Sequence, residues 1–212
     1  MGGPRHPEPP VPAPAALDST DARILAIAAE HVRRYGFAKT TVTAVAREAG
    51  MTHANVYRYF PSKEALADSI TAAWLRPIEQ LLAEVVDAPD PADDKLERMI
   101  LALAGAHRDK LEQDPQLFDL YVEAFEAMRG VARKHRARIR TLLDRVIEEG
   151  AASGLFHLRR QERAAVFLFD MVFRFIHPVP VRMDRDIPRR VWDERLAVAV
   201  RVVLRGMTAG LV

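Results

Sequence analysis

The segment TTVTAVAREAGMTHANVYRYFPSKE, residues 40–64, predicts two short helices joined by a tight turn. Thr41 is placed to cap the first helix, because its hydroxyl can accept a hydrogen bond from a first-turn amide that has no other partner. Gly50 follows the last apolar residue of that helix and can adopt the left-handed backbone that a sharp turn needs. Thr52 then caps a second helix over residues 53–59. Two helices in this arrangement predict a helix-turn-helix unit.

The second helix exposes more aromatic and hydrogen-bonding side chains than a buried helix would. Its inward residues are few, chiefly Val56 and Phe60. In a helix-turn-helix, the partner that covers such a surface is the major groove of DNA. Residues 33–63 contain six basic residues and the single acid Glu48, although the whole chain has a formal charge of only +2. This local excess of positive charge suits a polyanion and predicts binding that weakens as the salt concentration rises.

These residues resemble the amino-terminal pattern of the TetR (tetracycline-repressor-like) family of transcriptional regulators. Two residues of the second helix, Ala54 and Asn55, differ from those common in the family, which bears on the DNA sequence that is read. The resemblance implies an N-terminal three-helix DNA-binding head, residues 18–64, and a larger helical domain, residues 65–212, for ligand binding and dimerisation. The residues that carry the resemblance are Tyr35, Gly36, Phe37, Thr40, Thr41, Val45, Ala46, Ala49, Gly50, Thr52, Tyr57, Tyr59, Phe60, Ser62, Lys63 and Glu64.

The head is expected to divide its contacts between bases and phosphates. Asn55 can pair with an adenine through two hydrogen bonds, a contact that discriminates between bases. Arg58 can reach either a base or a phosphate, and Thr52 caps the helix that enters the groove. The other expected contacts are Thr43, His53 and Ala54 at base edges, and Thr41, Arg47, Tyr57, Tyr59 and Lys63 at phosphates.

The whole chain predicts an all-α fold. Alternating strand patterns are absent, and no Asn-Gly or Asp-Gly pair marks a hairpin. Ser19 is placed to cap a first helix that ends at Gly36. Ser62 caps a long fourth helix, in which Pro77 forms a kink or a break. Five further helices are expected at about residues 91–113, 115–128, 131–153, 161–177 and 188–208, with Asp90 and Asp114 as N-caps before prolines.

Residues 1–17 are rich in proline, with six prolines among the first fourteen residues. Proline removes an amide donor and biases the preceding residue away from helix, so we expect an extended or disordered tail, either inert or a ligand for a partner domain. We find neither a signal peptide nor a stretch of transmembrane length, and the chain contains no cysteine. These features predict a cytoplasmic protein without disulfides or thiolate metal sites.

The stretch QERAAVFLFDMVFRFIHP, residues 161–178, is apolar nearly all round and needs cover on several sides. Its surplus apolar face is the expected interface of a homodimer, and the alternative is the central core helix of a monomer. Asp170 and Arg174 are spaced as an i,i+4 pair, either between subunits or on the one solvated stripe of the helix. Residues of the last helix expected to join the interface are Val198, Val202, Val203 and Met207.

The lining of an effector pocket follows from the resemblance more than from the residues themselves. Aromatic and apolar side chains on helices that should face one another suit a hydrophobic or aromatic small molecule, and ordinary core is the alternative at each position. Arginines at residues 133–140 and 182–190 offer a site for an anion, or form solvated faces. The expected lining residues are His107, Phe118, Tyr121, Phe125, Phe167 and Met171.

Enzyme motifs are missing from the sequence. It contains no GxxxxGK[ST], GxGxxG, HExxH or GxSxG pattern, and its seven histidines lie at spacings that suggest no metal cluster. We therefore expect a DNA-binding regulator without a cofactor, most simply a homodimeric repressor that a small molecule releases from a palindromic operator. The alternatives are an all-α ligand-binding protein without specific DNA binding and, more remotely, an all-α enzyme.

Overall fold

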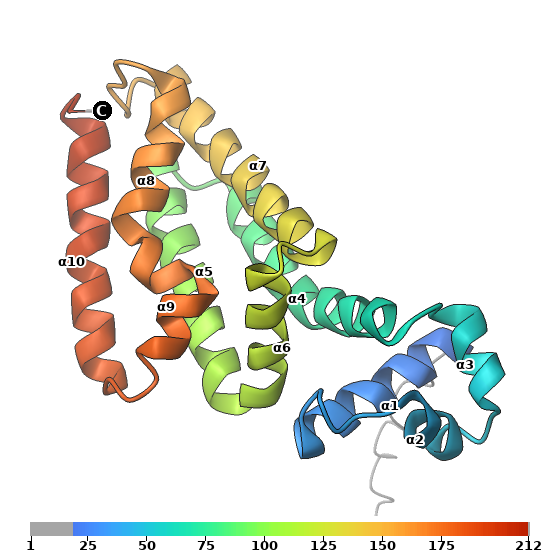
Figure 1. Cartoon of the computed structure of the whole chain (residues 1–212). Helices are drawn as coiled ribbons and strands as arrows, with labels where there is room; N and C mark the ends of the chain where they lie inside the picture. The colour runs from blue at the N-terminus through green and yellow to red at the C-terminus, as the bar shows by residue number, and fades with distance from the viewer. Residues whose placement is uncertain (1–18, 212) are drawn as a thin grey trace, which may run out of the picture.

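The computed structural model describes residues 19–211, which form ten α-helices and no β-strand (Figure 1). The predicted all-α fold is confirmed, whereas the predicted proline-rich tail, residues 1–17, lies outside the described residues. The helices are α1 (Thr20–Tyr35), α2 (Val42–Glu48), α3 (His53–Tyr59), α4 (Lys63–Asp87), α5 (Ala92–Gln113), α6 (Pro115–Glu126), α7 (Gly130–Ala152), α8 (Gln161–Ile176), α9 (Pro178–Met183) and α10 (Arg189–Thr208).

The N-caps predicted for the first four helices are all present. The hydroxyl of Ser19 accepts a hydrogen bond from the amide of Ala22 at 3.4 Å. The hydroxyls of Thr41, Thr52 and Ser62 likewise accept from amides three residues further on, at 3.1, 3.3 and 3.0 Å. Each cap satisfies an amide that its helix leaves free, and therefore fixes where the helix begins.

Helices α1, α2 and α3 form a small head around the fully buried side chains of Ile24, Val45 and Val56. Gly50, with φ of +67°, turns the chain between α2 and α3 as predicted. Helix α4 then runs from the head into the larger body (Figure 1). Pro77 lies inside α4, and the helix continues through it without a break. The head and the body are therefore joined by one long helix.

The body is a bundle in which α5 packs against α4, α6, α7, α8, α9 and α10. Arg108 on α5 is almost fully buried and donates hydrogen bonds to the backbone carbonyls of Asp184 at 2.8 Å and Ile187 at 2.9 Å. These bonds hold the connection between α9 and α10 against the centre of the bundle. Figure 1 shows α8 and α10 side by side at the end of the body farthest from the head.

The short helix α9 was not predicted. Its sequence contains Pro178 and Pro180, and we expected no helix between residues 177 and 188. Proline is tolerated in the first turn of a helix, where its missing amide would have no partner anyway. His177 caps α9, because its Nδ1 accepts a hydrogen bond from the amide of Val179 at 3.3 Å.

Of the two N-caps predicted in the body, Asp114 takes the N-cap position of α6 before Pro115 but makes no side-chain cap bond, whereas Asp90 is not the N-cap of α5. Helix α5 has no side-chain cap, and the carboxylate of Asp90 instead pairs with Arg98. Asp114 does precede α6, but its carboxylate accepts hydrogen bonds from Nε of Arg33 at 2.8 Å and from Nε1 of Trp74 at 3.1 Å. Asp114 therefore connects α1 of the head with α4 and the turn between α5 and α6.

A stretch of transmembrane length does occur, contrary to our expectation. Residues 161–183 contain an 18-residue window with a mean hydropathy of 1.5 and are long and apolar enough to cross a membrane by length and composition alone. In the structure this stretch is divided into α8 and α9 at His177 and packs into the body. Its apolar character therefore serves contacts between helices.

Candidate functional site

The outward surface of α3 consists of residues that can read DNA. His53, Ala54, Asn55 and Arg58 are exposed, whereas Val56 on the same helix is fully buried. Thr43 on α2 is exposed as well. The head therefore presents the predicted base-reading side chains to solvent while a single apolar residue anchors the helix, as insertion into a groove requires.

Two aromatic contacts organise this surface before any DNA is bound. The rings of His53 and Tyr57 meet edge to face at 4.6 Å between centroids. Arg58 donates a hydrogen bond to the hydroxyl of Tyr59 at 3.2 Å, which is the largest cause of the lowered pKa of Tyr59. In the free protein Arg58 is therefore held against Tyr59.

The other predicted phosphate contacts surround α3. Thr41 uses its oxygen as a cap, as does Thr52, which was predicted only as the cap of α3, but each hydroxyl keeps a proton that it can donate to a phosphate. Arg47 is exposed. Lys63 is half-buried. Its Nζ donates a hydrogen bond to the carbonyl of Ala38 at 3.4 Å and lies 4.5 Å from the ring centroid of Phe37.

The positive charge of this surface is smaller than the sequence count indicates. Arg34 pairs with Glu30 at 2.6 Å, and Arg33 pairs with Asp114, so both belong to α1 and its contact with the body. Glu48 is bound by His31 at 2.7 Å. The basic residues of the segment that make no ion pair among residues 19–211 are Lys39, Arg47, Arg58 and Lys63.

Four of the six predicted effector-lining residues meet in the body. The ring of His107 lies 6.4 Å from that of Phe118 and 5.8 Å from that of Tyr121, measured between centroids. Tyr121 in turn lies 6.5 Å from Phe125. All are buried except Phe125, which is half-buried. Helices α5 and α6 therefore bring these four side chains into one aromatic cluster.

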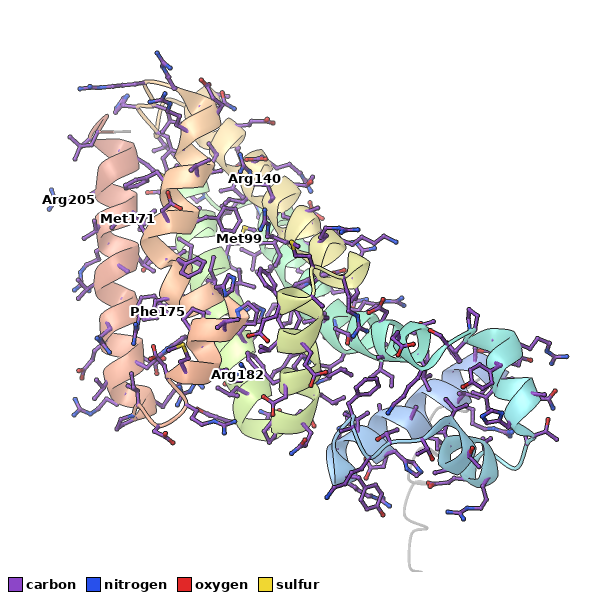
Figure 2. The ribbon with its side chains drawn as sticks, in the orientation of Figure 1. Met99, Arg140, Met171, Phe175, Arg182 and Arg205 are labelled. Atoms are coloured by element: carbon purple, nitrogen blue, oxygen red, sulfur yellow. The ribbon has the colours of Figure 1, made fainter. Side chains whose placement is uncertain are left out.

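Phe167 and Met171 do not join this cluster. Phe167 is half-buried against other parts of the core, and Met171 is 40% exposed. Figure 2 shows Met171 on α8, apart from Met99, which lies deeper between α5 and α7. The α8 residues that face the interior are instead Leu168, Val172 and Ile176.

The cluster contains two residues that sequence reasoning missed, His135 and Trp74. The ring of His135 lies 6.2 Å from His107 and 5.8 Å from Tyr121, and Trp74 lies 6.4 Å from Tyr121. His135 belongs to a basic run that we interpreted as a solvated face. A signal was available, because the buried residues of α7 recur at helical spacing: Ala132, His135, Ile139, Leu143 and Val146.

The polar atoms of this cluster are poorly satisfied. Both ring nitrogens of His107 and Nε2 of His135 are buried without a hydrogen-bond partner, whereas Nδ1 of His135 lies 2.8 Å from Oε1 of Glu79. Burial, and next the nearby His135, lower the pKa of His107 to about 3. The carbonyl of Ile176 acts in the other direction without reaching hydrogen-bonding geometry. His107 is therefore a neutral imidazole at pH 7.

The pKa of His107 predicts a pH-dependent stability. Between pH 3 and about 6.5 the unfolded chain binds a proton that the folded protein excludes. The free energy of unfolding contributed by this residue is therefore lost as the pH falls below about 6.5, by up to about 1.4 kcal/mol per pH unit. In urea denaturation at pH 7, 6 and 5, we expect His107→Phe to remove this slope. His157→Phe, at an exposed histidine, should retain it, and equal slopes in the two variants would contradict the assignment.

No group of three or more metal-ligating side chains occurs within residues 19–211. The unpaired nitrogens of His107 and His135 therefore lack the additional ligands of an ordinary protein metal site. Their arrangement suits hydrogen bonding to a buried molecule.

An exposed apolar surface covers α8 and α10. Val166 and Phe173 on α8 are 50% and 49% exposed, and Val198 and Val202 on α10 are 52% and 46% exposed. We call these four residues the apolar face. Val203 and Met207, which we expected there, are completely buried within the subunit, because they point from α10 towards the core.

Asp170 and Arg174, which are spaced as an i,i+4 pair, do not pair with each other within the subunit. Arg174 instead binds the buried carboxylate of Asp184 at 2.6 Å, beyond the end of α9. The helical spacing was compatible with the pair, but the turn after α9 brings a less exposed carboxylate within reach. Asp170 remains exposed beside the apolar face.

A helix-turn-helix head with an exposed second helix, joined to an all-helical body, defines a DNA-binding transcriptional regulator. Residues 24–70 match the family model described as bacterial regulatory proteins, tetR family. Residues 92–190 match the model described as tetracyclin repressor-like, C-terminal domain. The chain belongs to the TetR family of transcriptional regulators, whose members bind DNA operators, respond to small-molecule effectors and act as dimers.

Individual relatives agree with this family. The HTH-type transcriptional regulator YhgD of Bacillus subtilis (strain 168) is 26% identical over 132 residues, which are 62% of this chain and 69% of that protein. A transcriptional regulator from Pseudomonas aeruginosa PAO1 has a TM-score of 0.67 at 20% identity, with 90% of each chain covered. The structure of RolR in complex with resorcinol has a TM-score of 0.61 at 16% identity, covering 90% of this chain and 88% of RolR. These structures share the fold.

Proposed function

We propose that the chain is a cytoplasmic, homodimeric repressor that a small molecule releases from a palindromic operator, and that it is not an enzyme. The observation that carries this proposal is the exposed surface of α3, where His53, Asn55 and Arg58 face solvent around the buried anchor Val56. In this proposal residues 18–64 form the DNA-binding head. Residues 65–212 form the effector-binding and dimerisation domain.

On the operator, α3 lies in the major groove. Asn55 pairs with an adenine, and Arg58 contacts either a base or a phosphate after leaving Tyr59. The side chains in this arrangement divide into Thr43, His53 and Ala54 near base edges and Thr41, Arg47, Thr52, Tyr57, Tyr59 and Lys63 near phosphates. Because phosphate contacts carry no sequence information, specificity rests on few residues of α3.

Two substitutions in the head are expected to have different effects on DNA binding. Lys63→Ala should weaken binding to all duplexes about equally and lower the slope of log affinity against log salt by about one unit, since one phosphate contact is lost. Asn55→Ala should change which sequences are preferred, by about 1 to 3 kcal/mol at one base pair. Selection from randomised duplexes, followed by titrations at several salt concentrations, measures both effects.

Lys134→Ala, at an exposed lysine of α7 in the body, is the matched control and should change neither quantity. An unchanged ranking of sequences with Asn55→Ala would remove Asn55 as a base reader. If the wild-type protein enriched no sequence at all, the alternative of a ligand-binding protein without specific DNA binding would replace this proposal.

The proposed effector site is the cluster of His107, Phe118, Tyr121 and Phe125, extended by His135. It lies in the body beside α4, the helix that leads to the head. RolR, a protein of the same fold, is known in complex with resorcinol. A site of aromatic side chains with a few polar atoms agrees with a small, largely apolar effector.

The proposed dimer interface is the apolar face on α8 and α10. Its four aliphatic and aromatic side chains lie about half exposed on two neighbouring helices. Contiguous exposed apolar side chains on a soluble protein mark a surface for association. Two copies related by a two-fold axis would each cover this surface with the same surface of the other.

A further inference from the structure

Three buried nitrogens in the core of the body have no hydrogen-bond partner and indicate a site for a bound molecule. Buried polar groups in folded proteins almost always have hydrogen-bond partners, and an unpaired one costs stability. Nδ1 and Nε2 of His107 and Nε2 of His135 have none, although His107 and His135 are each only 1% exposed. All three nitrogens lie on two rings whose centroids are 6.2 Å apart. One small polar group between these rings could therefore satisfy more than one of them.

The hydrogen-bonding character of the two rings restricts the chemistry of that group. A neutral imidazole has one N–H donor and one acceptor nitrogen, so His107 offers both. Nδ1 of His135 faces a carboxylate oxygen of Glu79 and must donate to it. Nε2 of His135 is then an acceptor when the ring is neutral and a donor when the ring is charged. A hydroxyl group satisfies either state, because it both donates and accepts.

Charged groups fit this position poorly. The nearby cation Lys110 lies over the ring of Trp74, 4.3 Å from its centroid, and already has the carboxylate of Asp114 as a counter-charge, and Glu79 adds negative charge behind His135. Glu79 is itself bound by Arg138 at 2.8 Å as well as by His135, so it has little capacity left for a cationic ligand. Burial raises the pKa of Tyr121, whose ring lies beside both histidines, and keeps its phenol neutral. A charged ligand would lose its hydration here without gaining a counter-ion.

An apolar cavity lies one helical turn along α5 and α7 from the histidines, neither of which lines it. It has a volume of about 10 Å³ and lies between α5, α7 and α8. Leu103 and Ile139 line it, one helical turn from His107 and His135 respectively, together with Ile176, whose carbonyl lies near His107. The remaining lining residues are Met99, Ile100, Leu143, Leu168, Phe169 and Val172. The two histidines therefore form the polar end of a site whose other end is apolar.

We propose that this site binds a neutral molecule with a hydroxyl group at one end and a hydrocarbon body at the other, the hydroxyl between His107 and His135 and the body between α5, α7 and α8. That this molecule is the effector rests on the proposed function. The cavity is too small for it in the described state, so binding must separate α8 from α5 and α7. The ligand therefore binds the conformation with separated helices more tightly than the described one. Such a difference in affinity between two conformations is the condition for regulation.

The test measures the binding of three probes that share a butylphenyl body: 4-butylphenol, butylbenzene and 4-butylbenzoate. Calorimetric titration of the full chain should give a preference of about tenfold or more for 4-butylphenol over each of the others, since only it satisfies the nitrogens without adding charge. His107→Phe should reduce the preference over butylbenzene towards one, and His157→Phe, at an exposed histidine, should leave it unchanged. The preference of the wild-type protein decides the question even if His107→Phe does not fold.

Four results would overturn the proposal: no binding of 4-butylphenol, equal or tighter binding of 4-butylbenzoate, equal binding of butylbenzene, or an unchanged preference in folded His107→Phe. Release of the selected operator duplex by 4-butylphenol supports the role as effector, and an operator affinity unaffected by saturating 4-butylphenol overturns that role. Failure of the proposed function can be distinguished from failure of this proposal, because the two are measured in different experiments. In that case the wild-type protein selects no operator, whereas the preference among the three probes is measured without DNA.

Discussion

Replacing Val198 with glutamate is expected to separate the dimer into monomers and to weaken operator binding by about a hundred- to ten-thousandfold. Val198 is 52% exposed on α10, so the isolated subunit tolerates the charge. In the proposed interface two glutamates would be buried near the two-fold axis without partners. Burying two unpaired charges costs far more free energy than the interface gains at this position. A monomer then binds each half-site alone and loses the gain in affinity from linked binding.

Sedimentation and titration of full and half operators measure this effect. The variant should bind a half-site about as well as the wild-type protein does, because its head is unchanged. Leu81→Glu, at a residue 40% exposed on α4, introduces the same charge at a comparable surface position and should remain dimeric. A dimeric Val198→Glu protein would show that α10 does not form the interface.

The head could be predicted from the sequence because its determinants are local. Thr41 and Thr52 cap helices through amides three residues away, and Gly50 supplies its own positive φ. Such features depend on neighbours in the chain and hardly on packing. Helix boundaries and exposed residues of the head therefore agree with the sequence analysis.

The body could be predicted only in outline, because its chemistry depends on contacts between distant residues. Glu79 and His135 are 56 residues apart, and Arg33 and Asp114 are 81 apart. A histidine in a basic run gave no sign that a carboxylate from another helix would orient it. Similarly, Asp114 before a proline predicted a cap, but two donors from other helices outweigh the local amide. The aromatic cluster was therefore predicted only in part, from four of its residues and without His135 and Trp74.

A chain of contacts leads from the effector site to the head. Trp74 on α4 lies 6.2 Å from Phe118 and 6.4 Å from Tyr121, and both of these rings lie beside His107. Trp74 also donates to Asp114. Burial acts to raise the pKa of Asp114, but the hydrogen bonds from Trp74 and Arg33 outweigh it and lower that pKa. Asp114 is therefore ionised at neutral pH and holds α1 to α4.

This geometry supports a mechanism in which the effector and the operator each weaken the binding of the other. The two recognition helices of a dimer must lie about 34 to 36 Å apart to enter successive major grooves. A ligand that displaces the rings around Trp74 disturbs the bonds of Asp114 and so shifts α1 and α4 together. A second bond, from Nε of Arg129 to Asp68 at 2.7 Å, ties the body to the first turns of α4. The heads then lose the required separation.

Asp114→Ala is expected to reduce the coupling between effector and operator while leaving each separate affinity nearly unchanged. In the wild-type protein the effector should weaken operator binding by a factor of about 5 to 150, and the operator must weaken effector binding by the same factor. Without Asp114, displacement of Trp74 no longer pulls on Arg33, so both factors should fall together towards one. Calorimetric titration of the effector with and without operator duplex, and of the duplex with and without effector, gives the two factors. Asp119→Ala, at a half-exposed aspartate of α6 outside this chain of contacts, should keep them. Undiminished coupling in Asp114→Ala would mean that the signal reaches the head without Asp114, through α4, Arg129 or the packing of α1 on α6.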